Sequence, residues 1–101
     1  MSFSVEVSAG SPSVVHVSGE LDVAAAPELK TCLAGLAHDD VAVDLAAVTF
    51  MDSSGISVLI GAHRESADLG RRFTLRSLSP AVAKVLKITG VDEVITIEAS
   101  D

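Results

Sequence analysis

The sequence predicts a single α/β domain in which a mixed sheet of four or five strands packs against three or four helices. Its 101 residues suit one compact domain, which we expect to span residues 1–101. Apolar residues make up 49% of the chain but only three residues are aromatic, so the core must consist mainly of aliphatic side chains. Segments with the two-residue period of strands alternate with segments of helical period. This alternation is typical of layered α/β folds.

The N-terminal third of the chain predicts a β-hairpin followed by a helix. Apolar and polar residues alternate over 3–8 and again over 15–18, on either side of a turn-like stretch at 9–12. The apolar residues between 29 and 36 then recur at the i, i+3, i+4, i+7 spacing of an amphipathic helix, which we expect to begin near Pro27. One face of this helix should therefore pack on the sheet.

The rest of the chain predicts three more strands and two more helices. In order, these are a buried strand over 41–45, a helix over 56–70, a strand over 73–77, a helix over 79–90 and a strand over 94–97. The helix over 79–90 has the clearest signals, because Ser79 suits the N-cap, Pro80 the first helical position and Gly90 the C-terminus. The complete order is β-β-α-β-α-β-α-β, which predicts a mixed sheet with helices packed unequally against its two faces.

The charge balance argues against nucleic acids and membranes as partners. Fourteen Asp and Glu residues outnumber seven Lys and Arg residues, which gives a formal net charge of −7. Nucleic acids and anionic membranes are bound through clustered cationic side chains, and the adjacent pair Arg71 and Arg72 follows Gly70 in what reads as a solvated turn. No apolar run approaches the roughly 18 residues that a membrane span needs.

The sequence predicts no metal site and no cofactor site. Cys32 is the one cysteine, which excludes an intramolecular disulfide and a thiolate metal site and favours a cytoplasmic location. Asp39, Asp40 and Asp44 lack the spacing of a calcium-binding loop. No Gly-rich loop with a lysine is present to hold nucleotide phosphates. We therefore expect the chain to be a substrate of a kinase and not a kinase itself.

The candidate functional segment is Asp52-Ser53-Ser54-Gly55, where a strand gives way to the second helix. Open α/β sheets place ligand-facing groups at such junctions. One interpretation is helix capping, because a Ser or Asp oxygen here can accept a hydrogen bond from a free N–H of the first turn. The other is phosphorylation, because a phosphate would meet free N–H groups and the positive end of the helix dipole. The residues alone leave both open.

Three motifs resemble those of the bacterial anti-sigma factor antagonists with a STAS domain. They are the segments Gly19–Asp22, Phe50–Ile56 and Ser77–Val82. The resemblance covers nearly the whole chain, and the order and spacing of the three motifs make it specific although each motif alone is weak. It implies a STAS fold and a regulatory binding protein without enzymatic activity.

The resemblance also implies a mechanism and a set of site residues. In that family the serine directly after the aspartate is the phosphoacceptor, here Ser53, with Ser54 as a secondary acceptor, and Asp22 is associated with partner recognition and efficient phosphorylation. The family's partner is an anti-sigma factor that is itself a serine kinase. Phosphorylation of the antagonist ends this binding, and a serine phosphatase restores it. The partner-binding residues implied in this way are Glu20, Asp22, Asp52, Ser53, Ser54, Gly55 and Ile56.

Two features depart from the family pattern. The family usually has a further C-terminal helix, whereas this chain ends four residues after Ile97. The family often has a threonine soon after the first motif, whereas this chain has alanine at 24–26 before Pro27. We therefore expect the first helix to lack a side-chain N-cap.

A serine hydrolase and a differently used STAS module are the two alternatives to this function. A serine hydrolase needs a histidine within reach of Ser53 or Ser54, but His63 lies about 15 Å along the same predicted helix at 1.5 Å per residue. His16 falls in a predicted strand and His38 at the predicted end of the first helix, so neither is expected to reach the serines. The alternative that stays open is a STAS scaffold or ligand-sensing module that phosphorylation does not regulate.

Gly55 is expected where a Cβ would crowd either the start of the second helix or the approaching partner, the alternative being that it is simply a turn glycine. From the sequence we expect Gly55→Ala to impair partner binding more than thermal stability.

Overall fold

The computed structural model describes residues 3–98 and confirms the predicted order of elements. The elements are β1 (Phe3–Ser8), β2 (Ser13–Leu21), α1 (Ala26–Ala34), β3 (Val41–Met51), α2 (Ser53–Asp68), β4 (Phe73–Arg76), α3 (Pro80–Thr89), the 3₁₀ helix η1 (Val91–Glu93) and β5 (Thr96–Glu98). A fourth helix at the C-terminus would lie outside the described residues.

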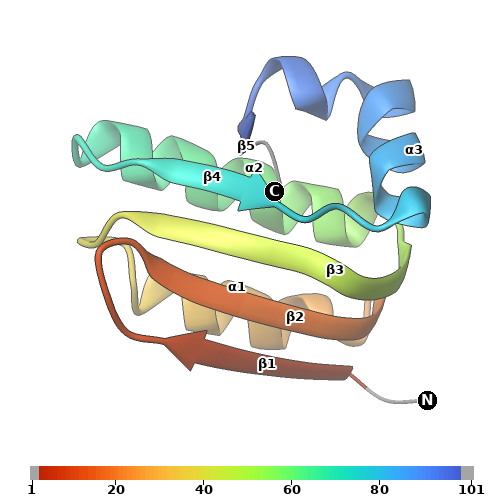
Figure 1. The fold of residues 1–101 in the computed structure, drawn as a ribbon, viewed down its shortest axis with the longest axis horizontal. Helices are drawn as coiled ribbons and strands as arrows, with labels where there is room; N and C mark the ends of the chain where they lie inside the picture. The colour runs from red at the N-terminus through yellow and green to blue at the C-terminus, as the bar shows by residue number, and fades with distance from the viewer. Residues whose placement is uncertain (1–2, 99–101) are drawn as a thin grey trace.

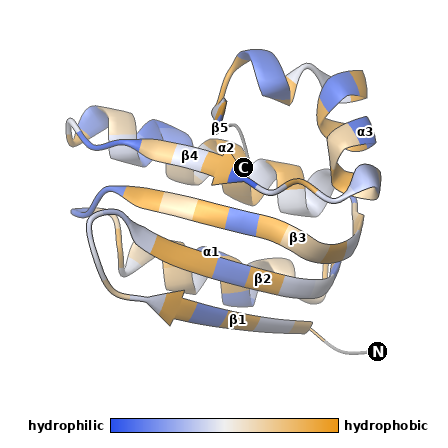
Figure 2. Cartoon of the chain, viewed as in Figure 1, coloured by the Kyte–Doolittle hydropathy of each residue, from blue (hydrophilic) through white to orange (hydrophobic). Residues whose placement is uncertain are grey.

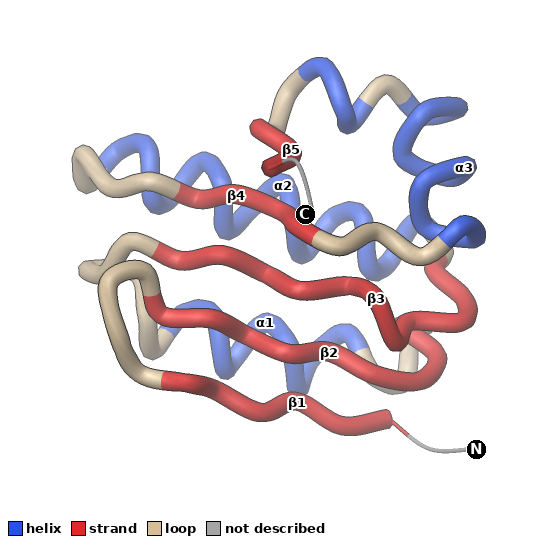
Figure 3. Tube along the Cα trace, in the orientation of Figure 1, coloured by secondary structure: helices blue, strands red, loops and turns tan. Residues whose placement is uncertain are grey.

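The five strands form one mixed sheet in the order β1-β2-β3-β4-β5. β1 pairs antiparallel with β2, which confirms the predicted hairpin, and β2, β3, β4 and β5 are all parallel. Figure 3 shows β1, β2, β3 and β4 lying side by side. Parallel neighbours need a crossover connection, and α1, α2 and α3 supply the three that this sheet requires. The carboxyl ends of β2, β3 and β4 therefore lie at one edge of the sheet.

The two faces of the sheet are covered unequally. α1 and α2 contact each other and lie together behind the sheet, and Figure 1 looks onto the face that they leave uncovered. β1, at the edge of the sheet, accordingly carries alternating hydrophobic and hydrophilic residues (Figure 2). The buried core on the helix side is aliphatic, as the composition predicted, and it includes Val15, Val17, Leu29, Leu33, Val43, Leu45, Leu59 and Leu75.

The third strand is longer than the sequence predicted. The predicted strand covers 41–45, whereas β3 continues to Met51. Its pairing with β2 shifts register twice, between His16 and Ser18 and between Gly19 and Glu20. Each shift sets an extra β3 residue against β2 and breaks the two-residue alternation, which hides the second half of the strand from a search for periodicity.

Other boundaries differ by a few residues. β5 begins at Thr96, because 91–93 form a 3₁₀ turn that carries the chain into the strand. α1 ends at Ala34, so His38 lies in the following turn and not in the helix. α2 begins at Ser53 and so includes the serines that the sequence placed before the helix.

α3 is fixed to the sheet by its capping serine. The Ser79 hydroxyl accepts a hydrogen bond from the Val82 N–H at 3.3 Å, as the sequence predicted, and donates one to the Val48 carbonyl of β3 at 2.6 Å. Ser79 is buried, and Gly90 ends the helix in the left-handed conformation at φ 78°. One side chain thus serves as both a helix cap and a tie to the strand.

We expect Ser79→Ala to lower the free energy of unfolding by about 1–2 kcal/mol, because it removes the cap and leaves the Val48 carbonyl without its donor. Urea unfolding followed by circular dichroism measures this difference. The control is Ser57→Ala, at an exposed position of α2, which should leave stability almost unchanged. Equal stability of the two variants would contradict the assigned role of Ser79.

Candidate functional site

The site lies where the carboxyl ends of β2 and β3 meet. Leu21 and Met51 are partners in the parallel pairing, and the Asp52 N–H donates to the Leu21 carbonyl at 3.4 Å. Asp22 and Asp52 directly follow these two residues, so the structure brings two of the three sequence motifs side by side. Such an edge is where parallel sheets present functional groups.

Asp52 is the N-cap of α2, and Ser53 and Ser54 are its first two residues. The Asp52 Oδ1 accepts a hydrogen bond from the Ser54 N–H at 2.9 Å. Ser53 is exposed, and its hydroxyl makes no hydrogen bond to any residue in the described range 3–98; Ser54 is half-buried. Capping is therefore carried out by the aspartate, which leaves the Ser53 hydroxyl facing solvent.

Asp22 organises the turn that leads into α1. Its Oδ1 accepts hydrogen bonds from the N–H groups of Ala24 at 3.1 Å and Ala25 at 3.0 Å. Ala25 is the N-cap position of α1 and forms no side-chain capping bond, as the sequence predicted. Asp22 thus has a structural function in addition to any role toward a partner.

Gly55 is buried and packs directly on the strand ends. A Cβ at this position would lie 2.7 Å from the Leu21 Cγ and 3.1 Å from the Met51 Cγ. Of the two expectations for this glycine, the structure favours crowding within the chain over crowding of a partner. The order of effects expected from the sequence for Gly55→Ala must therefore be reversed, with stability affected first.

The remaining sequence-predicted residues lie around this edge. Ile56 is half-buried and packs against the core, and Glu20 pairs across the sheet with Phe50. Sequence reasoning missed two exposed apolar side chains here, Val23 at 73% and Phe50 at 47% exposure. The residue type gave no signal, because valine and phenylalanine are ordinarily assigned to a core.

The three histidines do not approach Ser53. His63 lies on the second half of α2, with its ring edge-on to Phe73 at 6.4 Å between centroids. His16 lies within β2, 3.7 Å from an Asp44 carboxylate oxygen, and His38 is exposed in the turn after α1. No nucleophile and base pair is formed at the serines within residues 3–98.

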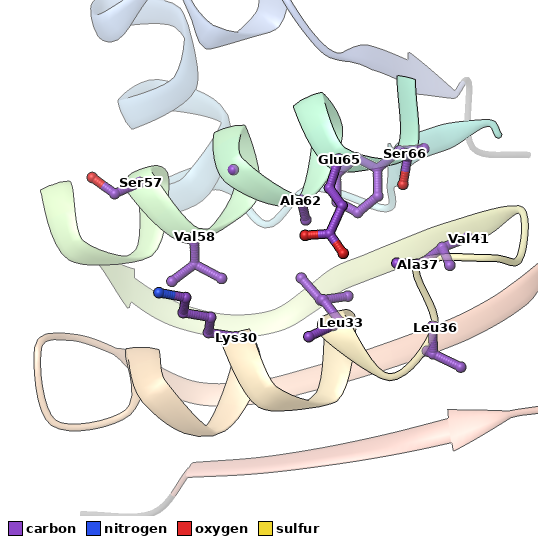
Figure 4. Close-up of a pocket in the computed structure, with 13 residues that line it drawn as sticks. Lys30, Leu33, Leu36, Ala37, Val41, Ser57, Val58, Ala62, Glu65 and Ser66 are labelled. Atoms are coloured by element: carbon purple, nitrogen blue, oxygen red, sulfur yellow. The ribbon is translucent and has the colours of Figure 1, made fainter. Parts of the chain in front are cut away.

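A separate cavity of about 270 Å³ lies between α1 and α2. Figure 4 shows Val58 of α2 pointing toward Lys30 of α1, and Ala62 and Glu65 of α2 lying above Leu33 of α1. Ser57 also lines it, one turn of α2 beyond Ser53. The wall is mostly apolar, which suits a small ligand better than an ion.

Neither a metal-binding group nor a membrane-spanning helix is found among the described residues. Within 3–98, no group of three His, Cys, Asp or Glu side chains is arranged to hold a metal ion. None of the helices in the same range is long and apolar enough to cross a bilayer.

Comparison with known proteins gives consistent matches. Residues 3–100 match the STAS domain family. The anti-sigma-B factor antagonist of Bacillus subtilis (strain 168) is 34% identical over 87 residues, which are 84% of this chain and 80% of that protein. An anti-sigma factor antagonist from Mycobacterium paratuberculosis has a TM-score of 0.86 at 27% identity, covering 95% of this chain and 85% of that one. The phosphorylated form of the Bacillus cell fate determinant SpoIIAA shares the fold, with a TM-score of 0.75 at 23% identity over 99% of this chain and 92% of that one.

We expect Gly55→Ala to lower the free energy of unfolding by about 1–3 kcal/mol, since the added methyl group overlaps Leu21. Gly61→Ala is the matched control in the same helix, because a Cβ there meets nothing within 4 Å. It should stabilise the protein by about 0.5–1 kcal/mol, the usual gain on replacing a helical glycine. Urea unfolding of both variants checks this. A Gly55→Ala protein as stable as wild type would disprove the contact.

Proposed function

Because the chain belongs to the STAS domain family, we propose that it is an anti-sigma factor antagonist whose binding is switched off by phosphorylation of Ser53. The observation that carries this proposal is the exposed Ser53 hydroxyl at the start of α2, which makes no hydrogen bond among the described residues 3–98 and lies beside the end of β2, directly before Asp22. In this proposal the unmodified protein binds an anti-sigma factor with serine kinase activity and thereby releases the sigma factor. A serine phosphatase resets the cycle.

The position of Ser53 leaves its hydroxyl accessible to an external kinase. Ser53 is exposed, and Asp52 rather than the serine satisfies the Ser54 N–H. Modification would therefore break no hydrogen bond that holds the helix. The proposal agrees with the names of the Bacillus subtilis and Mycobacterium paratuberculosis relatives, which are both anti-sigma factor antagonists, and SpoIIAA is a protein of this fold whose structure is known in the phosphorylated form.

Phosphorylation would act at the interface and not on the fold. It adds about −1.5 to −2 charges at Ser53, next to the Asp52 carboxylate. Within the monomer, the N-terminus of α2 offsets part of this charge. In the complex, the phosphate must lose its hydration and lie against a surface that fits a neutral hydroxyl. It would also lie close to the nucleotide held by the kinase. Unfavourable juxtaposition of charges costs several kcal/mol, which corresponds to a loss of roughly 100-fold or more in affinity.

We expect Ser53→Ala to bind the kinase partner persistently in the presence of ATP, and Ser53→Glu to bind it poorly but better than the phosphoprotein, because a carboxylate carries one charge. Calorimetric titration measures the affinities, and mass spectrometry after incubation with kinase and ATP locates the phosphate. Ser57→Ala, which alters an exposed serine one turn further along α2, should behave as wild type. A phosphate found on Ser57 and not on Ser53 would refute the assignment.

We expect Asp22→Asn to separate the two roles of Asp22. The asparagine oxygen can still accept from the Ala24 and Ala25 N–H groups, so the melting temperature should stay close to wild type. If the carboxylate charge contributes to recognition, phosphoryl transfer to Ser53 should slow severalfold. The initial rate of phosphorylation measures this. A wild-type rate with Asp22→Asn and a reduced melting temperature with Asp22→Ala would assign Asp22 a purely structural role.

A second candidate function is a ligand-sensing STAS module, which the cavity between α1 and α2 favours. Such a module would retain a small apolar molecule in native mass spectrometry and would accept no phosphate on Ser53 from any anti-sigma factor kinase. A scaffold protein would instead form large assemblies in size-exclusion chromatography. These readouts distinguish the three functions with one purified sample.

A further inference from the structure

The cavity between α1 and α2 reaches below the surface of the protein. Its volume is about 270 Å³, and part of its lining is almost inaccessible to solvent. These buried lining residues come from α1, the turn after it, β3, α2 and β4, and they are Leu33, Ala37, Val41, Ser66 and Phe73. A molecule held here would therefore contact the core and not only the outer faces of the two helices.

Small residues on the two helices leave this space open. Ala34 of α1 and Gly61 and Ala62 of α2 line the cavity, and a Cβ at Gly61 would meet no atom within 4 Å. Protein interiors are otherwise closely packed, and the atoms that line a void lose contacts with partners. A molecule that fills the cavity would restore these contacts.

Ser66 is the polar residue in the buried part of the lining. It is 3% exposed, and its hydroxyl makes no hydrogen bond to any residue of the described range 3–98. Figure 4 shows this hydroxyl directed from α2 toward the side of the cavity where Ala37 and Val41 lie. A purely apolar occupant would leave the hydroxyl without a partner, which is costly in a buried site. The occupant should therefore carry an oxygen that reaches Ser66.

The charged residues of the lining lie at the mouth of the cavity and have opposite signs. They are Lys30 of α1 and Glu65 of α2, and both are exposed. A carboxylate or an ammonium group in the buried part would find no opposite charge among the lining residues there. Because an unpaired charge is very unfavourable in such a place, the lining favours an uncharged occupant.

We propose that this cavity binds a small uncharged molecule that has an apolar body and one hydroxyl or carbonyl oxygen. The oxygen forms a hydrogen bond with the Ser66 hydroxyl, and the body packs against apolar residues such as Leu33 and Val58. Phenols, alcohols and ketones belong to this chemical class. The volume of about 270 Å³ lies just below the usual range for drug-sized ligands, so the ligand is compact.

The proposed ligand site is separate from the phosphorylation site. Ser53 begins α2, and Ser66 lies about 20 Å further along the same helix at 1.5 Å per residue. The inference rests on the second candidate function only in that it names the ligand class of a sensing module. It does not depend on phosphorylation of Ser53, and one protein could have both properties.

Titration of the full chain with phenol and with toluene, followed in amide NMR spectra, tests the proposal. The two probes have similar shapes and differ in a hydroxyl against a methyl group. Both should shift the amide signals of Leu33 and Ser66 and leave that of Glu6 on β1 unchanged. Ser66→Ala should weaken phenol binding by about five- to tenfold and leave toluene binding equal or tighter, because only phenol loses a hydrogen bond.

Three controls accompany this titration. Ser57→Ala makes the same change at an exposed residue of the lining in the same helix, so both affinities should stay as in the wild type. Ala62→Leu should fill the cavity and abolish binding of both probes, while its melting temperature verifies that it is folded. Benzoate and benzylammonium should bind at least about tenfold more weakly than phenol, because each places a charge in the buried part.

The melting temperature of Ser66→Ala separates a ligand role of Ser66 from a structural role. The hydroxyl makes no hydrogen bond among the described residues, and alanine favours a helix more than serine does, so the variant should be at least as stable as the wild type. A less stable variant with equal losses of phenol and toluene binding would show that Ser66 supports the packing and would overturn its assignment.

Two further results would contradict the proposal. If neither probe shifts the cavity amides in the millimolar range, the cavity is not a ligand site. If benzoate or benzylammonium binds more tightly than phenol, the ligand class is wrong. Phosphorylation of Ser53 is measured with a kinase and ATP and not with these probes, so failure of the ligand site leaves the switch intact, and failure of the switch leaves the ligand site intact.

Discussion

The parallel pairing of β2 with β3 at Leu21 and Met51 is the constraint on which the site depends. It sets Asp22 and Ser53, which are distant in sequence, at the same edge of the sheet. The first turn of α2 then lies directly on both strand ends. This close approach is possible because Gly55 has no Cβ, for which there would be no space beside Leu21. Anything that separates the helix from the strands would move the serine away from Asp22.

At this edge of the sheet the polar side chains make different hydrogen bonds. Asp52 satisfies the helix terminus, Asp22 satisfies the turn before α1, and Ser53 has no bonding task among the described residues. A covalent change at Ser53 can therefore alter the surface charge without disturbing the packing beneath it. A switch of this kind needs no conformational change in the antagonist, since the energy difference arises where two proteins meet.

The order of elements and the helix termini could be predicted because their signals are local. Ser79 and Gly90 act on backbone groups within one turn of themselves. The length of β3 could not, because its two register shifts depend on pairing with β2 and remove the alternation by which a strand is recognised. The crowding at Gly55 was one of two expectations, but the residue that causes it, Leu21, and the exposure of Phe50 could not be predicted, because both depend on which residues the register brings together.

The most direct test of the account is calorimetric titration of the anti-sigma factor kinase with two forms of the same chain, one unmodified and one phosphorylated at Ser53. The account predicts that phosphorylation weakens binding by roughly 100-fold or more, while the circular dichroism spectra of the two forms remain the same. Equal affinities for the two forms, or a phosphorylated form that has lost its secondary structure, would contradict it.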